Sequence, residues 1–313
     1  MSKKIIYAMI LMLSALLITG CSSGGSKQVT VDNPYIGGSQ GLIPTFEPMG
    51  VSSNGGTQTV YDNENIPIQI NIKNKGEYTV PSGQVTSTIK GISSADYTGI
   101  TFQKTNDQDI EKISEFNTNG GETTIDHGNG KLVDGRLDNR NLLTANIFAE
   151  IIYPYQTYIS APKVCFRDAS SKTGETICQV DNAALQVFSS GAPIRAVSAK
   201  EIQSGKGLVS FEFTIENAGG GESKKTTSAD FDYRYNEIGF SVKDSSNPSK
   251  WDCKSSGQTG TGRFDDANKL TILCKLTQTI GETEAYQSEL GLTLDYDYKV
   301  MINSDLVIKN HNT

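Results

Sequence analysis

The chain has 313 residues, a formal net charge of −7 and only two histidines. Cleavage after residue 20, expected below, would remove Lys3 and Lys4 and bring the net charge to −9. A surface this acidic repels nucleic-acid phosphates and anionic lipid headgroups. The composition therefore argues against nucleic acid as a partner, and against attraction to a membrane surface by charge alone.

The N-terminus has the features of a lipoprotein signal. Two lysines precede an uncharged run from Ile5 to Leu17, and Ile18–Cys21 resembles a lipobox. The run is shorter than the ~20 apolar residues that cross a bilayer, although an uncleaved signal-anchor and ordinary cleaved secretion stay open as alternatives. We expect residues 1–20 to be a signal peptide, and Cys21 to carry a lipid that anchors an extracytoplasmic lipoprotein at the cell surface or in the periplasm.

The segment that follows the predicted lipid has the composition of a linker. Residues 21–50 are rich in Gly and Ser, contain Pro, and lack apolar periodicity, which predicts a flexible connection. The rest of the chain is long enough for two domains. We assign the first to residues 51–190 and the second to residues 191–313.

Two separated sequence matches at one spacing favour a duplication. Ile68–Gly76 and Phe211–Gly219 both alternate apolar and polar residues and both end in Asn-x-Gly, 143 residues apart. The pair Tyr153–Ile159 and Tyr296–Ile302 repeats that spacing. Self-similarity at a fixed period is the signature of a repeated structural unit, so the sequence predicts tandem domains of one kind.

Short alternating runs dominate both predicted domains. Further alternation occurs over 143–151 and 290–294, and Asn and Gly at the ends of such runs favour turns. One exception is a possible helix of one or two turns that begins after Asp109, with Ile110, Ile113 and Phe116 along one side. Many short strands and almost no helical signal predict an all-β fold of two antiparallel β-sandwiches.

The strand that runs into Asn-x-Gly, in Ile68–Gly76 and Phe211–Gly219, resembles the immunoglobulin-like β-sandwiches found in tandem on prokaryotic cell surfaces. These include the bacterial cell-adhesion-related domain and its NPCBM-associated relatives. The resemblance covers about a third of each domain and implies a spacer or adhesive module, with fold rather than chemistry as the inherited part. It carries no functional residue over to this chain.

Four cysteines remain once Cys21 is assigned to the lipid, and an even number in an exported chain predicts disulfides. Three pairings are possible. We favour Cys165 with Cys178 and Cys253 with Cys274, because each pair brackets a turn-rich segment. The competing interpretations are a zinc site and a thiol nucleophile; both lack the close Cys or His spacing that such sites use. We therefore expect no metal and no cofactor.

Enzyme signatures are missing from the sequence, and we expect no catalytic residues. No nucleophile elbow, His-Glu-x-x-His or phosphate-binding loop occurs; a hydrolase that uses two carboxylates stays open, since it needs no local motif. Paired acids at Asp107 and Asp109, Asp230 and Asp232, and Asp295 and Asp297 raise the question of calcium. Alternating acids on a solvated strand explain the same pattern.

Paired tyrosines give the one hint of a binding surface. Tyr153 and Tyr155, like Tyr296 and Tyr298, are two residues apart and share a strand face. Exposed, they could stack on a sugar ring; buried, they would be core residues with bonded hydroxyls, as in a tyrosine corner. Their recurrence in both domains favours the structural role.

These patterns together predict a lipid-anchored surface protein that acts as an adhesion, assembly or envelope-structural module. Its expected partners are the membrane, through Cys21, and an envelope or surface protein. The alternative is a solute- or carbohydrate-binding lipoprotein that supplies a transporter or surface enzyme, with a glycan as ligand. An exposed strand edge would favour protein assembly by strand addition.

Overall fold

The computed structural model describes residues 32–52, 57–137, 140–168, 170, 172, 174–180, 184–203, 205–232, 234–243 and 250–312. All its extended elements are β-strands, and no α-helix occurs in these ranges. The all-β class is therefore confirmed. The predicted signal peptide and Cys21 lie outside the described residues.

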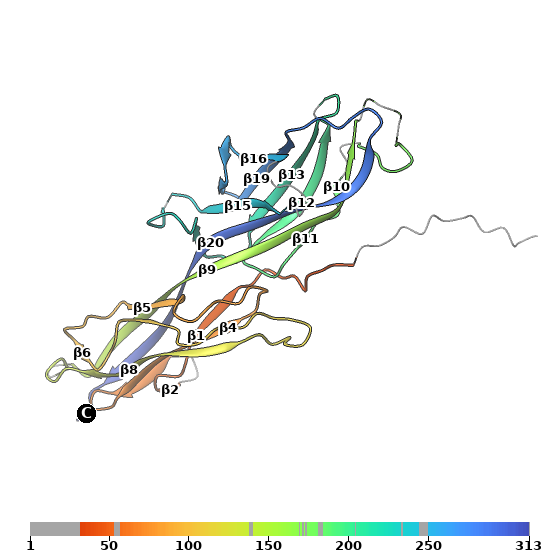
Figure 1. Ribbon diagram of the computed structural model, residues 1–313. Coiled ribbons are helices and arrows are strands. Elements are labelled where there is room, and N and C mark those ends of the chain that lie inside the picture. The colour runs from red at the N-terminus through yellow and green to blue at the C-terminus, as the bar shows by residue number, and fades with distance from the viewer. Residues whose placement is uncertain are drawn as a thin grey trace, which may run out of the picture. The chain divides into compact units, whose positions relative to one another are not determined.

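The strands form three sheets (Figure 1). The part of the chain before the first long strand contributes β1 (Leu42–Phe46), β2 (Val51–Ser52), β3 (Gln58–Tyr61), β4 (Ile66–Asn74), β5 (Thr86–Lys90), β6 (Tyr97–Thr98), β7 (Gln103–Thr105) and β8 (Glu122–Leu132). The long strand β9 (Leu142–Arg167) follows. The remainder contributes β10 (Ala184–Leu185), β11 (Phe188–Ser189), β12 (Ile194–Gln203), β13 (Val209–Asn217), β14 (Glu222–Lys224), β15 (Glu237–Lys243), β16 (Trp251–Ser255), β17 (Gln258–Thr259), β18 (Thr261–Arg263), β19 (Lys269–Leu276) and the second long strand β20 (Ala285–Lys309).

Two sheets are separate layers, and the third is shared. One has the order β1-β4-β8-β6 and another β10-β12-β13-β19-β16-β17. The shared sheet runs β18-β15-β20-β9-β5-β7, with β2, β3, β11 and β14 off that path. Strands β4 and β13 alternate buried and partly exposed residues along much of their length, as expected for layers with one face in a core. The sequence alternation thus predicted both strands correctly.

Strands β9 and β20 pair antiparallel over nearly their whole lengths, from Arg167 opposite Ala285 to Leu142 opposite Lys309. At one end β9 also pairs with β5, and β20 with β3; toward the other end β9 pairs with β11, and β20 with β15. We call these the first half and the second half of the molecule. Each long strand thus begins in the half built from its own sequence and ends in the other.

The 143-residue spacing has a direct structural counterpart. It relates β4 to β13 and the start of β9 to the start of β20. Within the β9–β20 ladder, Pro154 lies opposite Asp297, and these two residues are themselves 143 apart. The ladder is therefore related to itself by an approximate two-fold axis at that pair, as if two copies of one unit had exchanged their last strands.

This exchange changes the expected domain limits. Residues 299–309 of β20 belong to the first half, although they fall in the predicted domain 191–313. Residues 155–167 of β9 belong to the second half, although they fall in the predicted domain 51–190. Local patterns predict a strand but not its partner, because pairing depends on distant residues.

Two local expectations are also corrected. Strand β1 lies within the range 21–50 expected to be linker, and all five of its residues pair with β4. The possible helix after Asp109 does not form, since Ile110 makes a bridge with Val80 and Phe116 is 99% exposed. Ile113 is buried without a helix. Long-range pairing here overrides a weak local preference.

Candidate functional site

The four paired tyrosines lie at the centre of the molecule, where β9 and β20 pass from one half to the other. Tyr155 is opposite Tyr296, and Tyr153 is opposite Tyr298. Each is at most 1% exposed, and the neighbouring rings have centroids 5.8 to 6.3 Å apart. These are tilted or edge-on contacts typical of a packed core. The hypothesis that they stack on a glycan at the surface is therefore wrong, because no ring face is open to a ligand.

The repeated Asn-x-Gly motif holds these tyrosines. Tyr155 Oη donates to Asn74 Oδ1 over 3.2 Å, and Tyr298 Oη donates to Asn217 Oδ1 over 2.9 Å. Each asparagine also donates through Nδ2 to the carbonyl four residues later. Burial raises the pKa of Tyr298 to about 12, so the phenol keeps its proton. The sequence motif is thus a buried polar lock that ends β4 and β13.

Glycine is required at the third and last position of each Asn-x-Gly motif. A Cβ on Gly76 would lie 2.1 Å from Tyr155 Oη, and one on Gly219 would lie 2.5 Å from Tyr298 Oη. These distances are far below van der Waals contact, so any side chain would displace the tyrosine. The two motifs therefore serve the fold rather than a ligand.

The disulfides are Cys165–Cys178 and Cys253–Cys274, the pairing favoured from the sequence. Cys253 and Cys274 are directly opposite in β16 and β19, whereas Cys165 lies near the end of β9. Both bonds are consequently in the second half, not one in each predicted domain. Two disulfides indicate an oxidising, extracytoplasmic environment.

One acid of each pair is engaged in a contact within the protein. Asp109 accepts from the Ser82 amide at 2.7 Å, Asp232 binds Arg234, and Asp297 pairs with Lys224 at 3.2 Å. Among the described residues, no group of three or more His, Cys, Asp or Glu side chains is placed to hold a metal ion. The described residues therefore give no support to the calcium hypothesis.

A serine and a histidine meet in the first half in a geometry that resembles a catalytic dyad. His127 Nε2 lies 2.8 Å from Ser87 Oγ, and Nδ1 lies 2.6 Å from the Thr101 carbonyl oxygen. Because that carbonyl only accepts, Nδ1 carries the proton and Ser87 donates to Nε2. Burial lowers the pKa of His127, and both side chains are fully buried. The pair cannot meet a substrate, and we assign it to the core.

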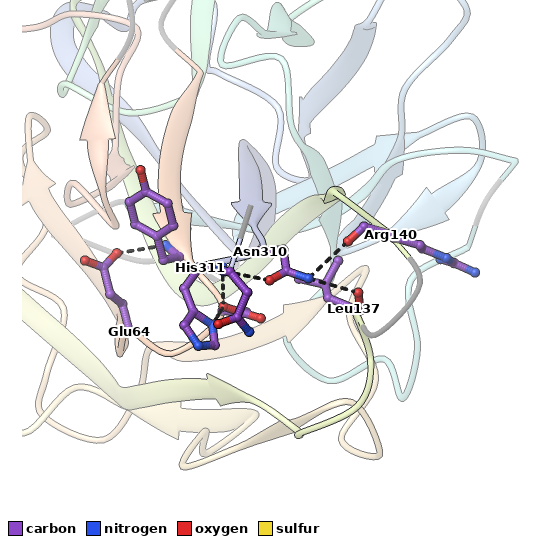
Figure 2. A network of polar contacts seen from close by, with 8 residues as sticks. Glu64, Leu137, Arg140, Asn310 and His311 are labelled. Carbon is purple, nitrogen blue, oxygen red and sulfur yellow. Dashed lines mark hydrogen bonds and ion pairs between the residues drawn. The ribbon is translucent and has the colours of Figure 1, made fainter.

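The C-terminal residues are held in a polar network against the first half (Figure 2). Asn310 Nδ2 donates to the carbonyl oxygens of Leu137 and Arg140, and His311 contacts Asp62 Oδ1 through its amide at 3.0 Å and Nδ1 at 2.6 Å. Partial burial raises the pKa of Asp62, but the bonds from His311 outweigh it and lower the pKa overall. The network fixes the end of β20 and presents no free reactive group.

One groove of the second half lies over β19 and β16. This groove of about 550 Å³ is lined mainly by charged side chains, among them Glu212, Asp252, Lys254, Arg263, Asp265 and Lys269. No aromatic ring is among its lining residues. The mixture of signs and the lack of a stacking platform give it no evident ligand.

A second groove, of about 340 Å³, follows the side of the first half at its junction with the second. One wall is β1, with Leu42, Ile43 and Pro44, and the other is β20, with Val300 and Ile302. Its lining also includes Pro193, Ala218, Tyr153 and Tyr298, together with Ser39, Gln40, Gly41 and Gly219. This groove is the candidate functional site. Its two tyrosines are each only 1% exposed, so they support the groove from the core and offer no ring face to a ligand.

The β20 wall of the groove has an unpaired backbone edge. Strand β14 pairs with β20 as far as Lys299, and β3 pairs with it from Leu306 onward. Between these points no strand of the described chain covers that edge of Val300–Asp305, which we call the open edge. Unpaired N–H and C=O groups on a strand edge are a template for another strand.

No local sequence pattern marks this site. Val300 and Ile302 read as ordinary core positions of an alternating strand, and nothing local reports whether a neighbouring strand is present. The one available signal is the 143-residue spacing, which makes Ile302 the equivalent of Ile159. A difference in burial between these two residues would then point to the site.

Comparisons with known proteins add little. No family model matches the chain, and no curated protein matches it. Among solved structures, the secreted serine protease VesC from Vibrio cholerae aligns with 8% identity and a TM-score of 0.20 over 84% of this chain. The match spans 51% of VesC, so this chain corresponds to about half of that protein's length. A TM-score this low supports no argument about fold or activity. Within the described residues, no helix has the length and apolar character to cross a membrane.

Proposed function

We propose that this protein is a lipid-anchored, extracytoplasmic module for adhesion or assembly, which binds another surface or envelope protein. The observation that carries the proposal is the open edge of β20 beside an aliphatic groove. Edge strands are usually shielded by charges, prolines or a covering segment. An edge that is left open next to apolar side chains suits strand addition, in which backbone bonds give affinity and pockets give specificity.

The proposed architecture is two immunoglobulin-like β-sandwiches that exchange their last strands. Its support is the antiparallel pairing within each layer and the matched tyrosine locks at Asn74 and Asn217. The exchange ties the halves together through two continuous strands rather than a linker. A protein joined in this way suits a rigid spacer that holds a partner away from the membrane.

The membrane anchor is tested at Cys21. Cys21→Ala should move the protein from the membrane fraction to the soluble extracytoplasmic fraction, because the thiol that accepts the lipid is lost. A variant that stays in the membrane fraction would overturn the lipoprotein assignment.

The assembly function is tested by cross-linking intact cells that express the full chain, followed by purification and mass spectrometry. The expected product is a covalent complex with one or a few envelope proteins. Recovery of glycan without protein would instead support the carbohydrate-binding alternative, which the buried tyrosines do not favour.

A further inference from the structure

An aromatic cluster brings the core of the second half to the surface, at the far end of the β9–β20 ladder. Tyr286 lies opposite Phe166, and the two rings stack with centroids 4.9 Å apart and an interplanar angle of 8°. Phe166 in turn contacts Phe211 and Trp251, with centroids 5.9 and 6.0 Å away. Phe211 and Phe166 are buried, whereas Tyr286 is 46% exposed. The cluster therefore ends in a half-exposed ring that is held flat against a buried one.

The first half closes the equivalent end without aromatic rings. At the 143-residue spacing Tyr286 corresponds to Leu143, and Phe211 corresponds to Ile68. Leu143 lies opposite Ile308 and packs against the core as a partly buried residue. Because aliphatic side chains suffice to close this end of one half, closure of the fold does not account for the exposed ring of Tyr286 in the other.

Tyr286 lines a groove of about 580 Å³, formed mainly by the segment that joins β19 to β20. Such a volume is typical of sites for small ligands. The polar side chains around the ring supply amide, hydroxyl, carboxylate and ammonium groups, from Gln278, Thr279, Thr283, Glu284 and Lys250. The amide and the two hydroxyls belong to exposed residues, so they are accessible to a ligand.

Hydrogen bonds fix the backbone of this groove. The amide and the hydroxyl of Thr277 both donate to the Lys250 carbonyl oxygen, at 2.7 and 2.8 Å. Three residues later, the Ile280 amide donates to the Gly207 carbonyl oxygen at 2.8 Å. A groove that is ordered before binding loses little conformational entropy when a ligand enters.

We propose that this groove binds an uncharged sugar residue of a glycan, with one face of the sugar ring stacked on Tyr286. A pyranose has C–H groups on its ring faces and hydroxyls around its rim, so it matches an aromatic platform bordered by polar side chains. Gln278 and Thr283 hydrogen-bond the hydroxyls. Lys250 and Glu284 carry opposite charges, which does not favour a polyanion. The site adds a ligand class to the protein partner proposed above and does not depend on the open edge of β20.

The test is a glycan array probed with the fluorescently labelled mature chain. It should bind oligosaccharides of uncharged hexoses or N-acetylhexosamines. Tyr286→Ala should weaken binding by about tenfold or more, because the platform is lost, and Tyr286→Phe should weaken it by less than about threefold, because the ring remains. Tyr61→Ala is the matched control: Tyr61 is 47% exposed in the first half, and its loss should leave binding unchanged.

Tyr286→Ala also uncovers Phe166, so a second variant keeps the test independent of folding. Gln278→Ala combined with Thr283→Ala changes two exposed side chains. It should keep the unfolding midpoint of the parent and weaken binding by about threefold or more. The proposal is overturned if no oligosaccharide binds, if the parent and all variants bind equally, or if only acidic glycans bind and salt removes them.

The outcome is separable from that of the assembly function. If cross-linking in intact cells captures an envelope protein and no sugar binds on the array, the glycan site is wrong and the assembly function stands. If a sugar binds and Tyr286→Ala loses it while no protein is captured, the glycan site stands and the assembly function fails.

Discussion

Removing one hydroxyl from each tyrosine lock should destabilise the protein unequally. In Tyr298→Phe the ring remains, but Asn217 Oδ1 loses its 2.9 Å donor and the Gly221 amide loses its 2.7 Å acceptor. In Tyr155→Phe, Asn74 Oδ1 keeps the Gly76 amide at 3.0 Å. The amide of Tyr78 loses only a long contact of 3.4 Å.

These differences set the expected magnitudes. A buried polar group left without a partner costs about 1–3 kcal/mol, whereas a lost bond whose partner is otherwise satisfied costs about 0.5–1.5 kcal/mol. We therefore expect Tyr298→Phe to lower the free energy of unfolding by about 2 kcal/mol and Tyr155→Phe by about 1 kcal/mol. Each kcal/mol corresponds to about 2–4 °C in Tm for domains of about 150–250 residues.

The assay is urea-induced unfolding followed by far-ultraviolet circular dichroism and by fluorescence of Trp251, the only tryptophan in the chain. Trp251 lies beside Phe166 and Phe211, so its emission reports the second half. Equal losses, or a larger loss in Tyr155→Phe, would show that these hydrogen bonds do not decide the stability of the two locks.

Three further predictions follow from the core. Burial holds the pKa of His127 below its ordinary value of 6.5, so near that pH the unfolded chain binds a proton there that the folded chain does not. The free energy of unfolding should therefore fall as the pH drops below ~6.5, by at most about 1.4 kcal/mol per pH unit. His127→Gln should remove this pH slope in urea titrations, while His311→Gln should retain it. Gly76→Ala and Gly219→Ala should each lower stability by more than about 1 kcal/mol. Gly281→Ala should be nearly neutral in the same titration, since the added Cβ meets only the Glu284 side chain, at 3.4 Å. Intact-mass measurement should show two disulfides. The double variant Cys253→Ala, Cys274→Ala should lower the free energy of unfolding by about 3 kcal/mol, because the unfolded chain gains loop-closure entropy. Four free thiols in the exported protein would contradict both statements.

The sequence by itself determined the all-β class, the strands β4 and β13 and the equivalence of the two units, and it favoured the cysteine pairing that the structure shows. All of these rest on local alternation, turn residues or spacing, which a linear pattern records directly. Alternation also placed the tyrosines on one strand face, although it could not say whether that face is buried.

Only the tertiary structure decided that β9 and β20 each serve both halves, because strand pairing joins residues as distant as Leu142 and Lys309. Pairing likewise moved Cys165 into the second half, drew β1 out of the predicted linker and buried the tyrosine rings between layers. The open edge was beyond sequence reasoning for the same reason: Ile302 and Ile159 are the same residue in equivalent strands. They differ in the residues opposite them, Ala149 and Leu292, and in the strand beside them: β11 pairs at Ile159, and no described strand pairs with the other edge at Ile302.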